Sequence, residues 1–386
     1  MFHLYPLIPF FFVALRLSLT LPVRWPLKLA CIIILLLIVQ QNFFFRYLAG
    51  GISSPSLPPW VLLALRWSLA VLVLFFILLL CHDLVAGLLW LSRRAGISLS
   101  LPFPDHWRLA GLLLLACILA SGGAYQALRV PDVRSTEIWL PNLPKELDGL
   151  NLVQISDLHA DTLRNAPKVR AIADKVNALR PDLILFTGDM IDGTVSARLN
   201  DVKPLAELRA RYGIFGCLGN HEYYSGLDAW LKQFARLGLT MLVNSHITLV
   251  IKGQTVVIAG VADPMASRYH GAASDIEIAL RGASQQALRI LLAHRPGEAE
   301  KAAAMGVDLQ LSGHTHGGQI RGFDLIVKLL NQGFVRGWYR VGHMALYVAP
   351  GVGLWNGFPV RLGVPAEITH IILRSSQRVV SPSPSS

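Results

Sequence analysis

The first third of the chain is dominated by long apolar runs. Crossing the hydrocarbon core of a bilayer takes about 20 mostly apolar residues, and four segments approach that length. Residues 28–45 and 108–128 are clear candidates, and residues 60–91 form a run long enough for one tilted helix. The first run, residues 4–21, is interrupted by prolines and an arginine; it is interpreted as a fourth span, with a cleaved signal peptide as the alternative. We therefore predict a membrane region over residues 1–130 with about four transmembrane helices.

After residue 150 the pattern changes to short apolar runs that alternate with amphipathic stretches. In residues 165–180 the apolar positions Val169, Ile172 and Val176 follow the spacing of one helix face. This alternation of strands and helices predicts an α/β domain, to which a hairpin and late strands add antiparallel pairing. The predicted strands are 150–156, 182–187, 214–218, 246–251, 254–260, 289–293, 307–311, 344–349 and 366–373, and the further predicted helices are 201–212, 226–238, 273–281 and 297–305.

The segments around this domain differ from it in composition. Residues 131–149 are interpreted as a linker or a strand that leads into the domain, which is expected over residues 150–374. The Ser- and Pro-rich segment 375–386 is predicted to be a disordered tail.

Charge divides the chain in the same way. Residues 1–130 contain nine Lys or Arg against two acids, whereas the rest carries 26 basic and 22 acidic side chains. The net charge of +11 therefore arises mainly from the flanks of the membrane segments. It is weak evidence for nucleic acid binding, which would need a basic patch on the soluble part.

The charges between the predicted spans indicate an orientation. Loops rich in Lys and Arg stay on the cytoplasmic side of a membrane. The loops after the first and third spans are rich in them, whereas the second carries only Arg46. Both termini and the soluble domain are therefore expected on the outer face, and this holds if only the last three segments span. The basic residues of the first and third loops are Arg16, Arg24, Lys28, Arg93, Arg94 and Arg108.

The predicted spans contain few charged residues. Asp83, His82 and Arg66 are expected near span ends, and Arg66 can extend its side chain to the membrane surface. Charges deep in a span mark transport or binding pathways. The membrane region is therefore interpreted as an anchor that can also present substrate, with a transporter or lipid-binding bundle as the alternative. The four cysteines form no C-x-x-C pair, so no disulfide framework or zinc knuckle is predicted.

Residues of the metal-binding types follow five of the predicted strands at the point where each strand ends. Because the carboxyl ends of strands in α/β sheets form a common edge, five such loops can converge on one site. Each motif alone is weak, and a lone histidine is more often a core or surface residue. All five in this order predict a single site. The motifs are Asp157-Leu158-His159, Gly188-Asp189-Met190-Ile191-Asp192, Gly219-Asn220-His221-Glu222, His294 and Gly313-His314-Thr315-His316.

This series of motifs resembles that of the calcineurin-like metallophosphoesterases, which runs D-x-H, G-D-x-x-D, G-N-H-E/D, a single His and G-H-x-H. The match covers residues 150–320, and the segment Pro365–Ile368 is similar to the bacterial membrane-associated branch of that family. The resemblance implies a β-sandwich flanked by helices, preceded here by an α-helical membrane region, in a bacterial inner (plasma) membrane. It does not cover the membrane segments, beyond the fact that some members of the family also carry such segments.

The resemblance also implies a role for each motif residue. Asp189 would bridge two metal ions, and His221 would stand beside the metals without binding them, as a catalytic residue. Glu222 and Asp192 are not expected to be ligands, and Asp192 is expected to cap a turn or to support a ligand by a hydrogen bond. One ion would be bound by Asp157, His159 and His316, and the second by Asn220, His294 and His314.

The chemistry of these residue types agrees with those roles. Two metals ~3.5–4 Å apart lower the pKa of a bridging water and hold the phosphoryl oxygens of an in-line displacement. A protonated His221 would stabilise the pentavalent state and protonate the leaving alkoxide. No Ser/His/Asp or Cys nucleophile arrangement is found, so attack by hydroxide activated by the two metals is favoured over a covalent intermediate. The mixed imidazole, carboxylate and amide set suits Mn, Fe or Zn better than Ca or Mg alone.

Residues 321–340 follow the last expected ligands and mix large apolar side chains with Lys328, Arg336 and Arg340. One interpretation is a loop that packs into the core. The other is a basic, apolar surface that contacts lipid or a lipid-linked substrate.

Together these features predict a metal-dependent hydrolase of phosphodiester, phosphomonoester or pyrophosphate bonds at the membrane surface. The expected partners are a phosphorylated substrate, with lipid-linked phosphates among the candidates, and membrane lipid. Nucleic acid is not expected, because the soluble part carries a modest charge. The alternative is a catalytically silent membrane receptor or scaffold that keeps the fold. Degenerate ligands would favour that alternative, and here the expected set is complete.

Overall fold

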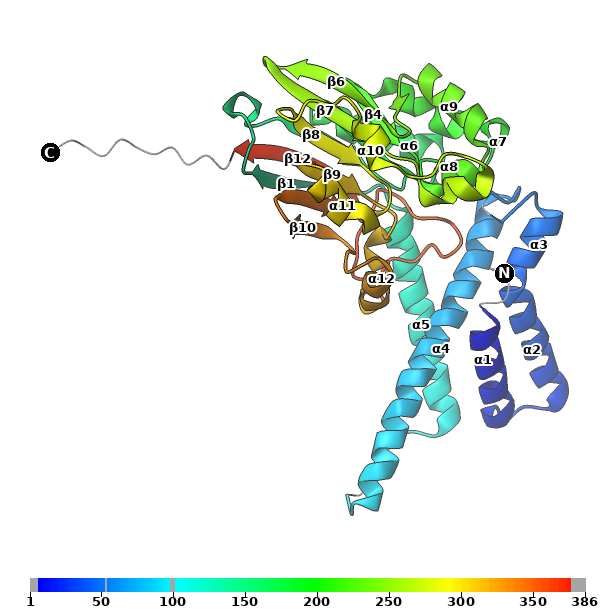
Figure 1. Cartoon of the computed structure of the whole chain (residues 1–386). Helices are drawn as coiled ribbons and strands as arrows, with labels where there is room; N and C mark the ends of the chain where they lie inside the picture. Colours follow the sequence, from blue (N-terminus) through cyan, green and yellow to red (C-terminus); the bar gives the residue numbers. More distant parts are fainter. Residues whose placement is uncertain (1–5, 53, 98–100, 376–386) are drawn as a thin grey trace. The chain divides into compact units, whose positions relative to one another are not determined.

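The computed structural model describes residues 6–52, 54–97 and 101–375 (Figure 1). The chain divides into two compact units. Unit 1 consists of Met1–Ala127 and Asn356–Leu362, and unit 2 of Leu128–Trp355 and Gly363–Ser386. The tail predicted to be disordered lies, from residue 376 onward, outside the described residues.

Unit 1 is built from apolar helices at the positions that the hydrophobic pattern predicts. Two of them, α4 and α5, are long and apolar enough to cross a membrane, and α2 and α3 form a third candidate span bent by 53°. Helix α1 has 14 residues, or about 21 Å at 1.5 Å per residue, which is less than the ~30 Å hydrocarbon core. The described residues thus contain two or three candidate spans where the sequence predicted about four. The helices are α1 (Leu7–Thr20), α2 (Trp25–Val39), α3 (Gln41–Leu48), α4 (Pro59–Arg94) and α5 (Asp105–Leu128).

Arg66 in α4 does not extend to a surface as expected from the sequence. Its side chain is fully buried, and it donates to Oδ1 of Asn42 at 2.6 Å and to the carbonyl oxygen of Ile52 at 3.3 Å. The guanidinium also lies 4.7 Å from the ring centroid of Phe45. The expectation was wrong because polar groups of the same unit satisfy the guanidinium where it is.

Unit 2 contains two six-stranded sheets among the described residues, with the orders β1-β12-β2-β3-β4-β5 and β10-β11-β9-β8-β7-β6. Strands β2 to β5 are parallel, as are β7, β8, β9 and β11. The strands are β1 (Asp132–Leu140), β2 (Asn151–Ile155), β3 (Leu183–Thr187), β4 (Ile214–Cys217), β5 (Thr240–Met241), β6 (Ser245–Ile251), β7 (Gln254–Gly260), β8 (Leu288–Leu292), β9 (Leu309–Ser312), β10 (Gly337–Val341), β11 (Met344–Val348) and β12 (Glu367–Ser375).

The two sheets pack face to face. Leu152 and Leu185 of the first sheet share one buried cluster with Ile290 and Leu309 of the second. Helices α6 (Ala166–Ala178) and α9 (Leu227–Arg236) contribute to a second cluster with the first sheet, and α10 (Ile276–Leu280) and α11 (Ala299–Ala304) to a third with the second sheet (Figure 1). The predicted β-sandwich flanked by helices is confirmed.

Several elements differ from the sequence prediction. In place of the helix predicted at 201–212, the structure has α7 (Val195–Val202), which begins and ends earlier, and then the 3-10 turn η2 (Lys203–Glu207). Helix α7 does not continue because Pro204 lacks the N–H that a continuing helix needs. Strand β1 forms within the segment interpreted as a linker or leading strand and pairs in parallel with β12. Strands β5 and β10 and helix α12 (Asp324–Leu330) were not predicted.

Candidate metal centre

The loops that follow five strands bring the predicted site residues together. β2, β3 and β4 are parallel neighbours in one sheet, and β8 and β9 are parallel neighbours in the other. Their carboxyl ends therefore deliver the following loops to one edge of the sandwich. β2 leads to Asp157 and His159, β3 to Asp189, β4 to Asn220 and His221, β8 to His294, and β9 to His314 and His316.

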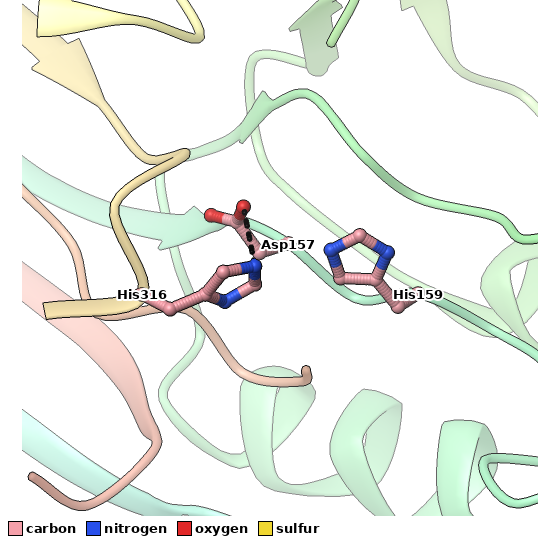
Figure 2. A group of neighbouring side chains, drawn as sticks. All are labelled: Asp157, His159 and His316. Atoms are coloured by element: carbon pink, nitrogen blue, oxygen red, sulfur yellow. Dashed lines mark ion pairs between the residues drawn. The ribbon is translucent and has the colours of Figure 1, made fainter. Parts of the chain in front are cut away.

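One group of ligand-type side chains consists of Asp157, His159 and His316 (Figure 2). Nε2 of His316 lies 3.7 Å from Oδ1 of Asp157, and the rings of His159 and His316 are 5.2 Å apart between centroids. The Asp157 carboxylate is fixed by the Ser156 hydroxyl, which donates to Oδ2 at 2.5 Å, and by the backbone N–H of His314 at 3.2 Å. The three side chains could hold a metal ion together.

A second group consists of Asp189, His294 and His314. Nε2 of His294 lies 3.2 Å from Oδ2 of Asp189 and 3.2 Å from Nδ1 of His314. The same Asp189 oxygen lies 3.7 Å from Nε2 of His159 in the first group. Asp189 is therefore located between the two groups, as the predicted bridging role requires.

Two nitrogen atoms show that these groups suit a cation. Nδ1 of His294 lies 2.8 Å from the carbonyl oxygen of Thr187 and donates its proton there, so Nε2 is the nitrogen that faces the site and can bind a metal ion once it has lost its own proton. Nε2 of His159 is buried and has no hydrogen-bond partner in the described part of the chain. A buried nitrogen without a partner costs free energy, and a divalent metal ion would satisfy it.

The backbone at these positions is held in an uncommon conformation. Asp157, His159, Asp189, His314 and His316 all have a positive φ, between 45° and 68°. A non-glycine residue rarely adopts this region, and residues held there cost about 1–3 kcal/mol each and concentrate at functional sites. Five of the seven predicted metal ligands share this feature.

Asn220 begins the short helix α8 (Asn220–Tyr224) and contacts an arginine that the sequence did not single out. Arg295 donates to Oδ2 of Asp263 at 2.8 Å, and its Nη2 lies 3.3 Å from Oδ1 of Asn220. The Asp263 side chain is fully buried, while a third of the Arg295 side chain is exposed. Arg295 therefore places a fixed positive charge next to the group formed by Asp189, His294 and His314. No motif marked this residue, and only its position after His294 pointed to it.

His221 is paired with Asp192 and, with the predicted ligands His159 and Asp189, forms a third group of side chains that could hold a metal ion. Nδ1 of His221 is hydrogen-bonded to Oδ1 of Asp192, and Nδ1 of His159 lies 3.3 Å from the same oxygen. The rings of His159 and His221 meet edge to face at 4.6 Å. Asp192 is fully buried and supports both histidines by hydrogen bonds.

Glu222 connects two of the site loops through three backbone N–H groups. Its carboxylate accepts hydrogen bonds from the N–H groups of Asp189 at 3.1 Å, Met190 at 2.6 Å and Gly219 at 2.7 Å. The side chain is completely buried. Gly219 itself leaves no room for a side chain, because a Cβ there would overlap Asp189. Glu222 therefore fixes the loop that carries Asp189, a function that its place in the motif did not indicate.

The pKa values of the histidines His294 and His221 and of the carboxylate of Asp189 are shifted by their neighbours in the site. Burial alone would lower the pKa of His294, but the carboxylates of Asp189 and Asp157 outweigh it and raise that pKa to about 10. In the same way, burial opposes but Asp189 and Asp192 raise the pKa of His221 to about 9. Burial would raise the pKa of Asp189, yet the charges of His294 and His221 hold it well below its ordinary value. The site thus contains ionised carboxylates that favour positive charge.

Comparisons with known proteins identify which sequences and structures this chain is similar to. A family model described as calcineurin-like phosphoesterase matches residues 150–318. A transmembrane protein with metallophosphoesterase domain from Danio rerio is 34% identical over 316 residues, covering 79% of this chain and 71% of the relative. An uncharacterized metallophosphoesterase from Helicobacter pylori (strain J99 / ATCC 700824) is 35% identical over 284 residues, covering 73% and 72%. The solved structure of the calcineurin-like phosphoesterase YfkN from Bacillus subtilis aligns with a TM-score of 0.37 at 17% identity, over 53% of this chain and 81% of that chain.

The similarity to the Danio rerio protein extends beyond unit 2. Residues 131–386 make up about two thirds of the chain, whereas that match covers 79% of it. The match therefore reaches into the apolar first third, which the resemblance carried by the motifs does not cover.

Proposed function

The chain belongs to the calcineurin-like phosphoesterase family, and on this basis we propose that it is a membrane-anchored, two-metal hydrolase of phosphate esters or phosphoanhydrides. The observation that carries the proposal is the position of Asp189. One of its oxygens, Oδ2, lies 3.2 Å from Nε2 of His294 and 3.7 Å from Nε2 of His159. A carboxylate shared between two groups of histidines is the arrangement that a pair of neighbouring dications needs.

We propose that Asp157, His159 and His316 hold one divalent ion, that Asn220, His294 and His314 hold the second, and that Asp189 binds both. This imidazole, carboxylate and amide set suits Mn, Fe or Zn. Bound there, two such ions would make a water molecule acidic enough to attack phosphorus near neutral pH and would offset the negative charge on the phosphoryl oxygens.

The side chains around the metals have separate tasks in this proposal. His221 is positively charged because it pairs with Asp192, and it donates a proton from Nε2 to the leaving oxygen of the substrate. The Arg295 guanidinium, held by Asp263, binds an oxygen of the substrate phosphate. Glu222 keeps the Asp189 loop in position through its three backbone hydrogen bonds.

We further propose that this chemistry takes place at the outer face of a bacterial inner (plasma) membrane, on a phosphorylated substrate that can be lipid-linked. Helices α4 and α5 are joined by a segment flanked by Arg93, Arg94 and Arg108, and such basic segments stay cytoplasmic. The end of α5, from which the chain enters unit 2, then lies on the opposite side. A reporter enzyme fused after residue 130 should be active outside the cytoplasm; activity only in the cytoplasm would refute this orientation.

The hydrolase proposal is tested with the purified full chain supplied with Mn. The substrates are an aryl phosphodiester, an aryl phosphomonoester and a lipid pyrophosphate, and Asp189→Ala is compared with the control Asp228→Ala on the exposed face of α9. We expect turnover of at least one substrate by the wild type and by the control, and loss of turnover in Asp189→Ala. No turnover by the wild type would favour a silent receptor that keeps the fold, and undiminished turnover in Asp189→Ala would refute the assigned site.

A further inference from the structure

Helix α12 (Asp324–Leu330) turns large apolar side chains toward solvent. Leu325 is 68% exposed, Ile326 56%, Leu329 83% and Leu330 79%, and no residue of this helix is buried. Isolated exposed apolar residues are common on soluble proteins, but a group of this kind marks an interaction surface. The interpretation of residues 321–340 as a core-packing loop is therefore wrong for this helix.

The apolar residues share one side of α12. At about 100° per residue, Leu325, Ile326, Leu329 and Leu330 fall within an arc of about 140°. Asp324 points to the other side, where its carboxylate pairs with Arg336 at 3.0 Å. The helix thus has an inner side joined to the protein and an outer side made of aliphatic groups.

α12 is firmly attached to the turn that carries the last two predicted metal ligands. Arg336 donates to the carbonyl oxygen of Gly317 at 2.7 Å while it pairs with Asp324. The Thr315 hydroxyl donates to the carbonyl oxygen of Val335 at 2.6 Å. The outward aliphatic side of α12 is therefore held in place by hydrogen bonds and an ion pair next to His314 and His316. Arg336 has a structural role and is not a free basic group of this surface.

The C-terminal end of α12 also borders a cavity next to the candidate metal centre. This cavity has a volume of about 240 Å³, and its lining includes Leu330, Gln332, His294 and Arg295. One residue of the apolar surface, Leu330, and one predicted metal ligand, His294, therefore line the same cavity within unit 2.

We propose that the aliphatic side of α12 docks into the surface of the lipid bilayer that anchors this chain. A helix with a one-sided apolar surface and basic flanks binds at the headgroup level, with its apolar side among the upper acyl chains. Arg321 and Lys328 are both exposed beside the four aliphatic residues and suit the negative charge of anionic headgroups. The bilayer is always within reach, since the same chain carries helices long and apolar enough to span it. Docking there would direct the cavity of His294 and Arg295 toward lipid headgroups.

The docking is tested by measuring the depth of a spin label on the full chain in lipid nanodiscs that contain anionic lipid. Cys31, Cys81 and Cys117 are first replaced by alanine, and the buried Cys217 is retained. A nitroxide is then attached at Leu329→Cys or, as a matched helical control, at Lys232→Cys on the exposed side of α9. We expect the label at 329 to collide with oxygen more than with a water-soluble nickel complex, and the label at 232 to show the reverse. Equal access of the nickel complex to both positions would overturn the proposal.

A second set of variants tests the apolar contact itself. With the label at Ile326→Cys, the pair Leu325→Glu and Leu329→Glu should make the label several-fold more accessible to the nickel complex. Val250→Glu, which adds one such charge at a 71% exposed aliphatic residue of β6, should leave the accessibility of the label unchanged. Unaltered accessibility of the label in the double variant would overturn the proposal. A short distance between the labels of two chains would also overturn it, because it would show that a second copy of the chain docks there. These measurements need no turnover, so their outcome is independent of the hydrolase assay.

Discussion

His221 is hydrogen-bonded through Nδ1 to the buried carboxylate of Asp192. The same carboxylate lies 3.3 Å from Nδ1 of His159. Since a carboxylate only accepts, both rings carry their proton on Nδ1 at this contact and present Nε2 to the centre of the site. The buried carboxylate of Asp192 therefore orients both a predicted metal ligand, His159, and the predicted proton donor, His221.

Replacing Asp192 by asparagine should disturb both histidines without creating a cavity. We expect Asp192→Asn to lower kcat/KM by about 10- to 100-fold, the usual effect of losing a carboxylate that supports a ligand histidine. Phosphodiester turnover and metal affinity measure the effect, with Asp228→Asn on α9 as the control. An unchanged kcat/KM would mean that Asp192 does not orient the two rings.

Replacing His221 should slow turnover most for substrates whose leaving group needs a proton. We expect His221→Gln to reduce kcat by about 10²- to 10⁴-fold for an alkyl phosphate ester. The loss should be much smaller for a nitrophenyl ester, because nitrophenolate leaves without a proton. Metal content should stay at the wild-type value, since His221 is not proposed as a ligand. Equal losses for both esters would contradict proton donation by His221.

Metal binding should release protons. In the metal-free protein the pKa of His294 is raised to about 10, so the ring is protonated at pH 7 and must lose that proton to bind a metal. Metal affinity should therefore rise with pH between about 7 and 10. Titration calorimetry in buffers of different ionisation enthalpy measures the released protons, and a heat that does not depend on the buffer would contradict the prediction.

The same shifts predict how the metal-free protein depends on pH. His294 and His221 have pKa values raised to about 10 and about 9 when folded, against about 6.5 when unfolded. Between these values the folded state holds more protons than the unfolded state, so its stability falls as pH rises. The midpoint of thermal unfolding should be highest between about pH 4 and pH 6.5 and decline toward pH 10. Below that range it should fall again, because the pKa of Asp189 is lowered in the folded state. A midpoint that rises between about pH 6.5 and pH 10 would be inconsistent with the charge pairing in the site.

Glu222 should be required for stability rather than for chemistry. A glutamine at this position turns an NH₂ group toward at least one of the backbone N–H groups of Asp189, Met190 and Gly219. Leaving a buried donor unsatisfied costs about 1–3 kcal/mol. We therefore expect Glu222→Gln to lower the free energy of unfolding by that amount in denaturant titrations. Glu300→Gln on α11 is the control, and equal stability of the two variants would argue against the role of Glu222.

The sequence predicted the ligand residues better than their supports. Asp157, Asp189 and His294 each follow a short apolar strand, so their convergence could be expected from the rule that strand ends share an edge. The roles of Glu222 and Arg295 could not, because they depend on contacts with loops 32 and 75 residues away along the chain. Such contacts leave no periodicity in the sequence.

The membrane unit and α12 show two other limits of sequence patterns. Apolar runs located the helices of unit 1 but not the bend of 53° between α2 and α3. From the sequence alone, an apolar residue in the segment around Leu329 could belong to the core or to a surface that binds lipid. The exposed fractions of its aliphatic residues and the ion pair of Arg336 with Asp324 show which side of α12 faces the protein.

The proposed pair of metal ions that share Asp189 can be tested by measuring metal content and turnover on the same samples. The full chain is stripped of metal, reloaded with Mn and assayed on an aryl phosphodiester, in parallel with Asp189→Asn. We predict about two Mn per chain in the wild type, the number expected for a paired-metal hydrolase, with turnover that appears only on reloading. Asp189→Asn should bind fewer ions and lose turnover while it remains folded. Full turnover in the stripped wild type, or in a folded Asp189→Asn, would contradict the account.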